Sequence, residues 1–236
     1  MKKTYIIIMV SLVLLSSTIQ QKVKSPPQKI TQICEYEQKM RAQGLVNIQE
    51  INANILVELK YSTTDNFVGK DVYGCITNCY LQKHPAKMLS EANDLLKRKN
   101  GNYRLLVYDG GRPLSSQKIL WNSLTQYSPK QRATYVANPA QGSIHNYGAA
   151  VDVTIATKDG TPLDMGTKYD FFGELAYPKK ENYFLKIGKL TKQQLANRQL
   201  LRSVMKSAGY MSIEYEWWHF NAVSRQMAKQ TYKIIQ

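Results

Sequence analysis

Two short segments of the chain carry most of the residues that could do chemistry. The segment "SIHNYGAAVD" contains His145 and Asp152, and the segment "EYEWWHF" contains Glu216 and His219. Two neutral imidazoles and one carboxylate form a common ligand set for catalytic zinc, and they leave a fourth position open for water. Such a site lowers the pKa of the bound water from 15.7 towards roughly 7. His145, Asp152 and His219 are therefore candidate metal ligands.

Structural interpretations of the same residues are also open. The run "AAVDVTI" buries an acid, which is costly unless the acid is paired or binds a metal. Asp152 could instead be a structural carboxylate that accepts backbone hydrogen bonds, and "EYEWWHF" could be the end of a core strand. The remaining histidine, His84, precedes Pro85 at an expected helix start, where we expect an exposed side chain without a role.

Hydrolysis at such a metal also needs a base and a group that stabilises an oxyanion. Glu216 is the candidate base, but residues three apart in a straight strand point to opposite faces, so the chain must bend between Glu216 and His219. Arg112 follows the Gly-Gly turn of "YDGGRP", and its forked guanidinium could stabilise the oxyanion. The alternative for Arg112 is an ordinary surface arginine beside a proline turn.

The surrounding sequence predicts elements that could position these residues. Strands are expected around residues 55–59 and in "YRLLVYDGGRP", "GAAVDVTIAT" and "SIEYEWWHFNAV". Helices are expected in "HPAKMLSEANDLLKRK", "LSSQKILWNSLTQ" and "LTKQQLANRQLLRSVMKSAGY", the last with Gly209 as a candidate C-cap. Because these elements lack a regular βαβ rhythm, we predict a single α+β domain with a central antiparallel sheet and flanking helices.

The beginning of the chain has the features of an export signal. Residues 1–20 start with two lysines and continue with an apolar run over residues 5–15, shorter than the about 20 residues of a membrane span. An uncleaved anchor is the alternative. Residues 21–31 are polar with two prolines and are expected to form a linker. We therefore expect an exported, periplasmic or cell-surface protein with one domain at residues 32–236.

Composition limits the classes of partner. Of the 236 residues 43% are hydrophobic, which excludes a disordered chain. The net charge of +15 favours association with anionic wall polymers or membrane surfaces. The basic residues are scattered and no nucleic-acid motif is present, so we expect no nucleic-acid partner, and nothing indicates a protein partner.

The cysteines allow several pairings. Export would place Cys34, Cys75 and Cys79 in an oxidising compartment, and an odd number permits at most one bridge within the chain. Cys75 could pair with Cys79, or Cys34 with either. The spacing of Cys75 and Cys79 is similar to a zinc half-site, but no second cysteine pair accompanies it, so a disulfide or free thiols are favoured.

Taken in order, "YDGGRP", "SIHNYGAAVD" and "EYEWWHF" resemble the D-Ala-D-Ala dipeptidase branch of the zinc D,D-peptidases. The family patterns S-x-H-x-x-G-x-A-x-D and E-W-W-H are both matched, and the doubled tryptophan favours the dipeptidase branch over the carboxypeptidases. The segments "YSTTDNFVGKDVYG" and "MGTKYDFF" resemble further family segments, so the similarity covers about residues 45–225.

The resemblance implies a fold like that of the Hedgehog and DD-peptidase domains, with one Zn²⁺ per chain. It implies hydrolysis of D-Ala-D-Ala, or of a related small wall-derived dipeptide, in cell-wall metabolism. It implies that His145, Asp152 and His219 bind the metal. It also implies that Glu216 is the general base and that Arg112 stabilises the transition state. It further implies that Asp170 and Tyr61 bind the substrate's ammonium and that Ser143 binds its carboxylate.

One departure from the family pattern concerns the pocket. Gly111 stands where the family commonly has tyrosine, which leaves both the pocket shape and the preferred dipeptide open. Two other functions are kept as alternatives: a D,D-carboxypeptidase or endopeptidase acting on longer peptidoglycan peptides, and a wall-binding module without catalysis. Intact Glu216 and Arg112 argue against the second, because a binding module needs neither.

Overall fold

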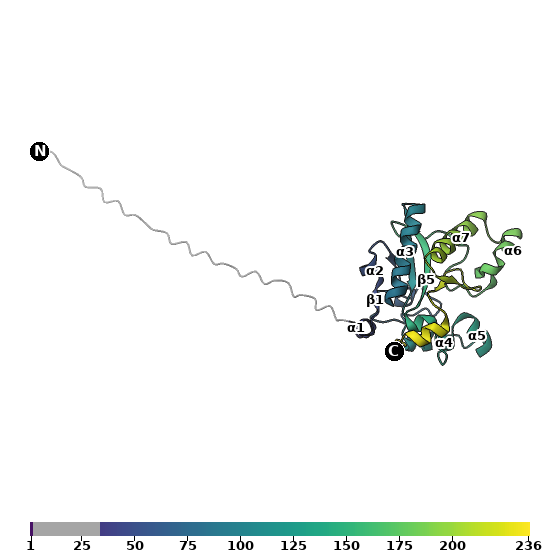
Figure 1. The fold of residues 1–236 in the computed structure, drawn as a ribbon, viewed down its shortest axis with the longest axis horizontal. Coiled ribbons are helices and arrows are strands. Elements are labelled where there is room, and N and C mark those ends of the chain that lie inside the picture. The colour runs from purple at the N-terminus through teal and green to yellow at the C-terminus, as the bar shows by residue number, and fades with distance from the viewer. Residues whose placement is uncertain (2–33) are drawn as a thin grey trace. The chain divides into compact units, whose positions relative to one another are not determined.

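The computed structural model describes Met1 and residues 34–236, drawn in colour in Figure 1. Apart from Met1, the predicted export signal at residues 1–20 and the predicted linker at residues 21–31 lie outside the described residues. The predicted domain is described from Cys34 onward. Among the described residues, no helix combines the length and apolarity that crossing a bilayer requires.

A five-stranded sheet forms the centre, in the order β2-β4-β5-β7-β6. Its strands are β2 (Leu56–Val57), β4 (Tyr103–Asp109), β5 (Ala150–Thr157), β6 (Met211–Ser212) and β7 (His219–Asn221). Neighbours pair antiparallel except at one edge, where β2 runs parallel to β4. The predicted α+β class is confirmed, and the sheet is antiparallel apart from this short edge strand. A separate antiparallel pair is formed by β1 (Val46–Asn47) and β3 (Tyr80–Leu81).

Helices flank this sheet, and Figure 1 shows the long α3 and α7 beside β5. The helices are α1 (Glu35–Ala42), α2 (Ile48–Ile51), α3 (Lys83–Lys99), α4 (Leu114–Ser123), α5 (Pro129–Tyr135), α6 (Glu181–Lys186), α7 (Lys192–Ser207) and α8 (Arg225–Thr231). Short 3₁₀ turns lie at η1 (Lys60–Ser62), η2 (Ile144–Tyr147), η3 (Glu174–Ala176) and η4 (Pro178–Lys180).

The two long helices form where the apolar spacing predicted them. In α3, Leu89, Ala92 and Leu96 are fully buried at helical spacing, and three basic residues fill the last turn. A Thr191–Gln194 capping box opens α7, and Gly209 follows its end with φ 93°, as the C-cap prediction required. Because α3 packs against both β4 and α7, the pair closes one side of the core.

The prediction of a continuous strand over "SIEYEWWHFNAV" is wrong. The chain forms the short strands β6 and β7, and the residues between them make bends. Trp217 and Trp218 are buried in this connection, with ring centroids 5.3 Å apart. Packing of the two indoles breaks the alternation expected of a strand, and this provides the bend that Glu216 and His219 require.

Strand register brings three functional side chains into one row. Asp152 of β5 pairs with His219 of β7 on one side and with Asp109 of β4 on the other. The register of β4 shifts between Val107 and Asp109, so Tyr108 is an extra residue at a β-bulge. Without this bulge Asp109 would not lie opposite Asp152. The end of the sheet is thus built to group charged side chains.

One of the open cysteine pairings is formed. Cys34 is bonded to Cys75, across a sequence separation of 41 residues, while Cys79 is a buried free thiol. Burial raises the pKa of the Cys79 thiol, which keeps it protonated and unreactive. The bridge ties the start of α1 to the segment that holds Tyr73, whose backbone N–H donates to the carbonyl of Tyr61 at 3.0 Å.

Removing this disulfide should lower the free energy of unfolding. A bridge closing a loop of this length restricts the unfolded chain and typically contributes about 2–4 kcal/mol. We expect a loss of that size for the Cys34→Ser and Cys75→Ser double variant in urea unfolding. The Cys79→Ala variant should stay sensitive to reductant, because it keeps the bridge. A Cys34→Ser variant whose stability still falls with reductant would contradict this pairing.

Candidate metal centre and active site

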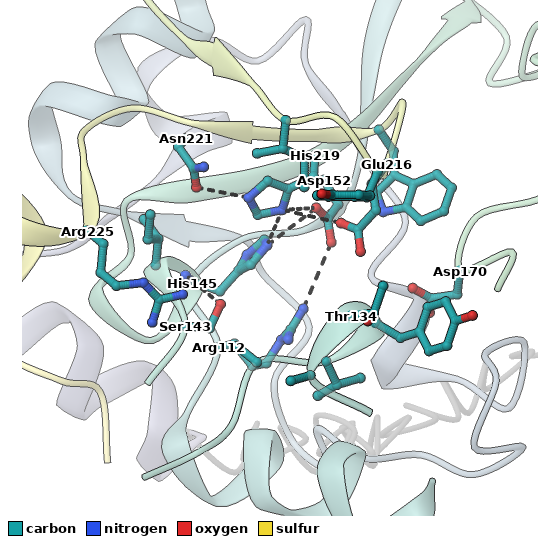
Figure 2. Close-up of a pocket in the computed structure, with 18 of the residues that line it drawn as sticks. Arg112, Thr134, Ser143, His145, Asp152, Asp170, Glu216, His219, Asn221 and Arg225 are labelled. Carbon is teal, nitrogen blue, oxygen red and sulfur yellow. Dashed lines mark hydrogen bonds and ion pairs between the residues drawn. The ribbon is translucent and has the colours of Figure 1, made fainter. Parts of the chain in front are cut away.

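Three side chains from separate elements meet at one point at the end of the sheet (Figure 2). His145 comes from η2, Asp152 from β5 and His219 from the first residue of β7. His145 Nε2 lies 3.1 Å from His219 Nδ1 and 3.3 Å from Asp152 Oδ1, and His219 Nδ1 lies 2.9 Å from Asp152 Oδ1. Ligands of a tetrahedral zinc ion, with bonds of about 2.0–2.1 Å, lie roughly 3.3 Å apart. The three atoms therefore match one face of such a site.

Hydrogen bonds behind the two imidazoles determine what their inner nitrogens can do. His145 Nδ1 donates to the carbonyl of Gly110 at 2.8 Å, and His219 Nε2 donates to Asn221 Oδ1 at 2.8 Å. The nitrogens that face each other are therefore both acceptors, and the nearby Asp152 oxygen is a third. Three electron pairs at this separation repel one another unless a cation lies among them. This donor set fits a metal ion.

The local sequence places His145 through a tight turn. Ser143 caps η2, accepting from the His145 N–H at 3.3 Å, and Gly148 ends the turn in the left-handed conformation with φ 64°. A Cβ on Gly148 would lie 2.8 Å from the Leu45 side chain, so glycine is required there for both reasons. The carbonyl of His145 also accepts from the Arg112 N–H at 3.0 Å, which joins this turn to the end of β4.

Asp152 uses its two oxygens differently. Oδ1 faces the histidines, while Oδ2 accepts a hydrogen bond from the Tyr169 hydroxyl at 2.9 Å. Burial alone would raise the pKa of Asp152, but positive charge placed on the two imidazoles outweighs burial and holds the pKa well below its usual range, and a metal ion held by neutral imidazoles would act in the same direction. An ionised carboxylate with one oxygen held and one oxygen free is suited to binding a cation.

Glu216 lies beside this cluster. Its Oε2 is 3.9 Å from His219 Nδ1, and its side chain is 21% exposed, facing the pocket. Burial raises the pKa of Glu216 to about 8. The bends at residues 214–215 and 217–218 let Glu216 and His219 approach one space, as the sequence required of a base near a metal. A bound cation would lower this pKa and favour the ionised form of Glu216, which can then accept a proton.

Arg112 is a buried and firmly held cation rather than a surface side chain. Its Nε donates to Asp109 Oδ2 at 2.9 Å, its Nη2 contacts the same oxygen, and its Nη1 donates to Gln117 Oε1 at 2.9 Å. Asp109 is fully buried and also accepts from the Tyr73 hydroxyl and from the Gly110 N–H. Arg112 Nη2 lies 3.9 Å from Asp152 Oδ2. The network therefore fixes the guanidinium beside the three candidate metal ligands, called the metal cluster below.

A pocket of about 250 Å³ opens over these side chains. Asp170 and Tyr61 line it on one side of the metal cluster, and Ser143 lines it on the other side, as Figure 2 shows for Asp170 and Ser143. The Tyr61 hydroxyl donates to Asp170 Oδ2 at 2.9 Å. Burial, together with repulsion from Asp152, raises the pKa of Asp170 well above its usual range. A bound cation would favour the ionised form of Asp170.

Gly111, the departure from the family pattern, lies against core residues. Gly111 points away from the pocket: a Cβ there would lie 2.7 Å from the Tyr80 carbonyl oxygen, 3.1 Å from Ile235 and 3.3 Å from Leu45. The C-terminal segment occupies this space, because Ile235 is fully buried and its N–H donates to Asn146 O at 2.8 Å. The glycine is therefore a matter of core packing.

All eight candidate residues suggested by the sequence line one pocket. The residues that hold these side chains in place were not predicted. The missed residues share the role of fixing a functional side chain by a hydrogen bond: Tyr73, Asp109, Gly110, Gln117, Tyr169 and Asn221. An acid at the tip of an apolar strand was a signal for Asp109, and Asn221 lies two residues after a proposed ligand. Nothing in the sequence distinguished the others. His84 is exposed, as predicted.

Comparison with known proteins gives the family. A family model described as D-Ala-D-Ala dipeptidase matches residues 41–236, and the chain belongs to this family. It is 31% identical to the D-alanyl-D-alanine dipeptidase of Escherichia coli over 75% of this chain and 83% of the relative. The enzymes of the same name from Enterococcus faecium and Enterococcus faecalis are 30% and 31% identical, over 75% and 76% of this chain and 90% and 92% of the relatives. A solved LdcB LD-carboxypeptidase is 19% identical with a TM-score of 0.40, over 64% of this chain and 63% of that chain, too remote to support an argument.

The hydrogen bond behind His219 should tune metal affinity. Asn221→Ala removes the acceptor that holds the His219 tautomer, and losses of this kind typically weaken metal binding about 10- to 100-fold. Isothermal titration of the metal-free protein with Zn²⁺ measures the change. Asn100→Ala, at the exposed end of α3, is the matched control and should bind like the parent. Unchanged affinity in Asn221→Ala would show that the tautomer is fixed by other contacts.

Proposed function

We propose that this protein hydrolyses the dipeptide D-Ala-D-Ala, or a related small wall-derived dipeptide, with one zinc ion held by His145, Asp152 and His219. The observation that carries the proposal is the meeting of three acceptor atoms within 3.3 Å of one another, with Glu216 and Arg112 at the same pocket. The curated relatives named D-alanyl-D-alanine dipeptidase support the choice of substrate.

The chain's own residues divide the work of hydrolysis. Zinc, when bound, polarises the scissile carbonyl and acidifies a water molecule. Glu216 accepts the proton of the attacking water and delivers it to the leaving amine, which balances the reaction without a further acid. Arg112 stabilises the negative charge that develops on the carbonyl oxygen. Because Asp109 and Gln117 hold the guanidinium in advance, Arg112 needs little reorganisation during the reaction.

The ends of the dipeptide match the ends of the pocket. Asp170, which accepts a hydrogen bond from Tyr61, forms an ion pair with the substrate's ammonium. Ser143 donates a hydrogen bond from its hydroxyl to the terminal carboxylate. Asp170 lies near Asp152, and the resulting repulsion makes a cation partner favourable. Asp170 has φ 56°, a strained conformation for a residue other than glycine, as often found at binding sites.

The cellular setting is also a proposal. The leader-like residues 1–20 support export to the periplasm or cell surface, and the net charge of +15 supports attraction to anionic wall polymers or membranes. An exported dipeptidase would recycle or remodel wall material, whereas glycopeptide resistance would require the enzyme in the cytoplasm. Fractionation of cells that express the full chain tests this: full-length protein in the cytoplasm would contradict export.

Activity should depend on both the metal and the base. The purified protein is expected to release D-alanine from D-Ala-D-Ala, to lose this activity with a chelator and to regain it with Zn²⁺. Loss of a general base typically costs about 10²- to 10⁴-fold in rate, so Glu216→Gln should lower kcat by that factor. Glu214→Gln, two residues away and exposed, is the matched control. Normal turnover by Glu216→Gln would exclude the proposed base.

Blocking the substrate's amine separates the dipeptidase from its alternatives. N-acetyl-D-Ala-D-Ala cannot form the ionic contact with Asp170, and a hydrogen bond to a charged group is worth about 1.5–3 kcal/mol. We expect kcat/KM to fall roughly 10- to 100-fold for the acetylated peptide, and Asp170→Asn to remove most of this preference. Faster cleavage of the blocked peptide would favour a carboxypeptidase. Binding to peptidoglycan without any hydrolysis would favour a wall-binding module.

A further inference from the structure

The carboxylate side of the pocket has a cation that the sequence motifs did not indicate. Among the described residues that line the pocket, two are arginines, Arg112 and Arg225, and none is a lysine. Figure 2 shows Arg225 extending toward Ser143, on the side of the metal cluster away from Asp170. Arg225 is the first residue of α8 and follows the end of β7 by four residues. The short connection from β7, which holds His219 and Asn221, therefore keeps Arg225 near the pocket.

Arg112 is not available to balance a substrate carboxylate. Its Nε and Nη2 both contact Asp109, and its Nη1 donates to Gln117. Its Nη2 lies 3.9 Å from Asp152 Oδ2, beside the candidate metal ligands, where the proposed function uses Arg112 for the carbonyl oxygen. A carboxylate that enters the pocket beside Ser143 therefore needs another cation.

Arg225 is anchored without being neutralised. Its Nη1 donates to the carbonyl of Gly142 at 2.5 Å, which fixes the guanidinium next to the residue that precedes Ser143. Within residues 34–236, no acidic side chain forms an ion pair with Arg225. Since a guanidinium has five N–H donors, the remaining donors can form a forked contact with a carboxylate.

We propose that Arg225 binds the terminal carboxylate of the substrate together with Ser143, and so selects peptides with a free C-terminus. This inference rests on the proposed function, because it takes the substrate to be a peptide cleaved at this site. Ser143 contributes one neutral hydrogen bond, and Arg225 contributes the charge. Arg225 is thus a specificity-determining residue outside the zinc and Glu216 machinery.

The test compares a free carboxylate with an amide at the same position. The parent protein, Arg225→Gln and Arg225→Lys are loaded with Zn²⁺ and assayed with D-Ala-D-Ala and D-Ala-D-Ala amide. For Arg225→Gln we expect kcat/KM for the free acid to fall roughly 5- to 50-fold, mainly through KM, with little change for the amide. Arg225→Lys should keep part of the preference, because it keeps the charge but loses the fork.

A matched control separates a direct contact from a general change of charge. Lys229→Gln removes the same charge one turn further along α8, at an exposed position outside the pocket, and should leave both substrates unaffected. If Arg225→Gln lowers kcat/KM equally for acid and amide, or not at all, the inference is overturned. Circular dichroism and urea unfolding identify a variant that has failed to fold, and Arg225→Lys then decides the outcome.

Failure of the proposed function gives a different result. If the parent protein cleaves neither dipeptide, calorimetric binding to the zinc-loaded protein is measured with D-Ala-D-Ala, with a longer peptide ending in D-Ala-D-Ala, and with the amide of each. Weaker binding of the free acids by Arg225→Gln than by the parent supports the carboxylate contact whichever peptide is the substrate. No preference of the parent for acid over amide overturns it.

Discussion

The site depends on one electrostatic constraint: three acceptor atoms, His145 Nε2, Asp152 Oδ1 and His219 Nδ1, are held within 3.3 Å of one another. Such a group is repulsive without a cation and becomes a strong ligand set with one. The protein maintains it by fixing the outer atom of each ligand, with the Gly110 carbonyl, the Tyr169 hydroxyl and Asn221 as partners. If a metal binds here as proposed, the stability of this end of the sheet and its function are linked through that metal.

A second constraint follows from the position of Asp109. A fully buried carboxylate is tolerated only when it is paired and hydrogen-bonded, and Asp109 receives donors from Tyr73, Gly110 and Arg112. The bulge in β4 sets Asp109 opposite Asp152, so the acid that holds Arg112 and the acid that is a candidate metal ligand occupy one row. The bulge thereby ties the position of the Arg112 guanidinium to the register of the sheet.

Local patterns predicted part of this structure, and long-range contacts decided the rest. The spacing of apolar residues was sufficient for α3, α7, β4 and β5, and motif order was sufficient for the ligand candidates. The strand expected over residues 212–223 failed because packing of Trp217 and Trp218 overrides strand alternation. The partners Tyr73 and Tyr169 could not be predicted, because each meets its carboxylate across 36 or 17 residues of chain through the tertiary fold. The surroundings of Gly111 could not be predicted, because one of its neighbours is Ile235, which is far away in the sequence.

Selectivity follows from where the pocket places its charges. Asp170 lies on one side of the candidate metal ligands and ionises when a cation binds beside it, and Arg225 lies on the other side, so in the proposed function the pocket is complementary to a short zwitterion. A site built this way rejects a peptide that lacks either terminal charge, because a pocket charge is then left without its partner. In the proposed function, a longer peptide would hold its ammonium away from Asp170 when its last peptide bond lies at the metal. In the proposed function, Asp170 and Arg225 would therefore select substrates by their length as well as by their terminal charges.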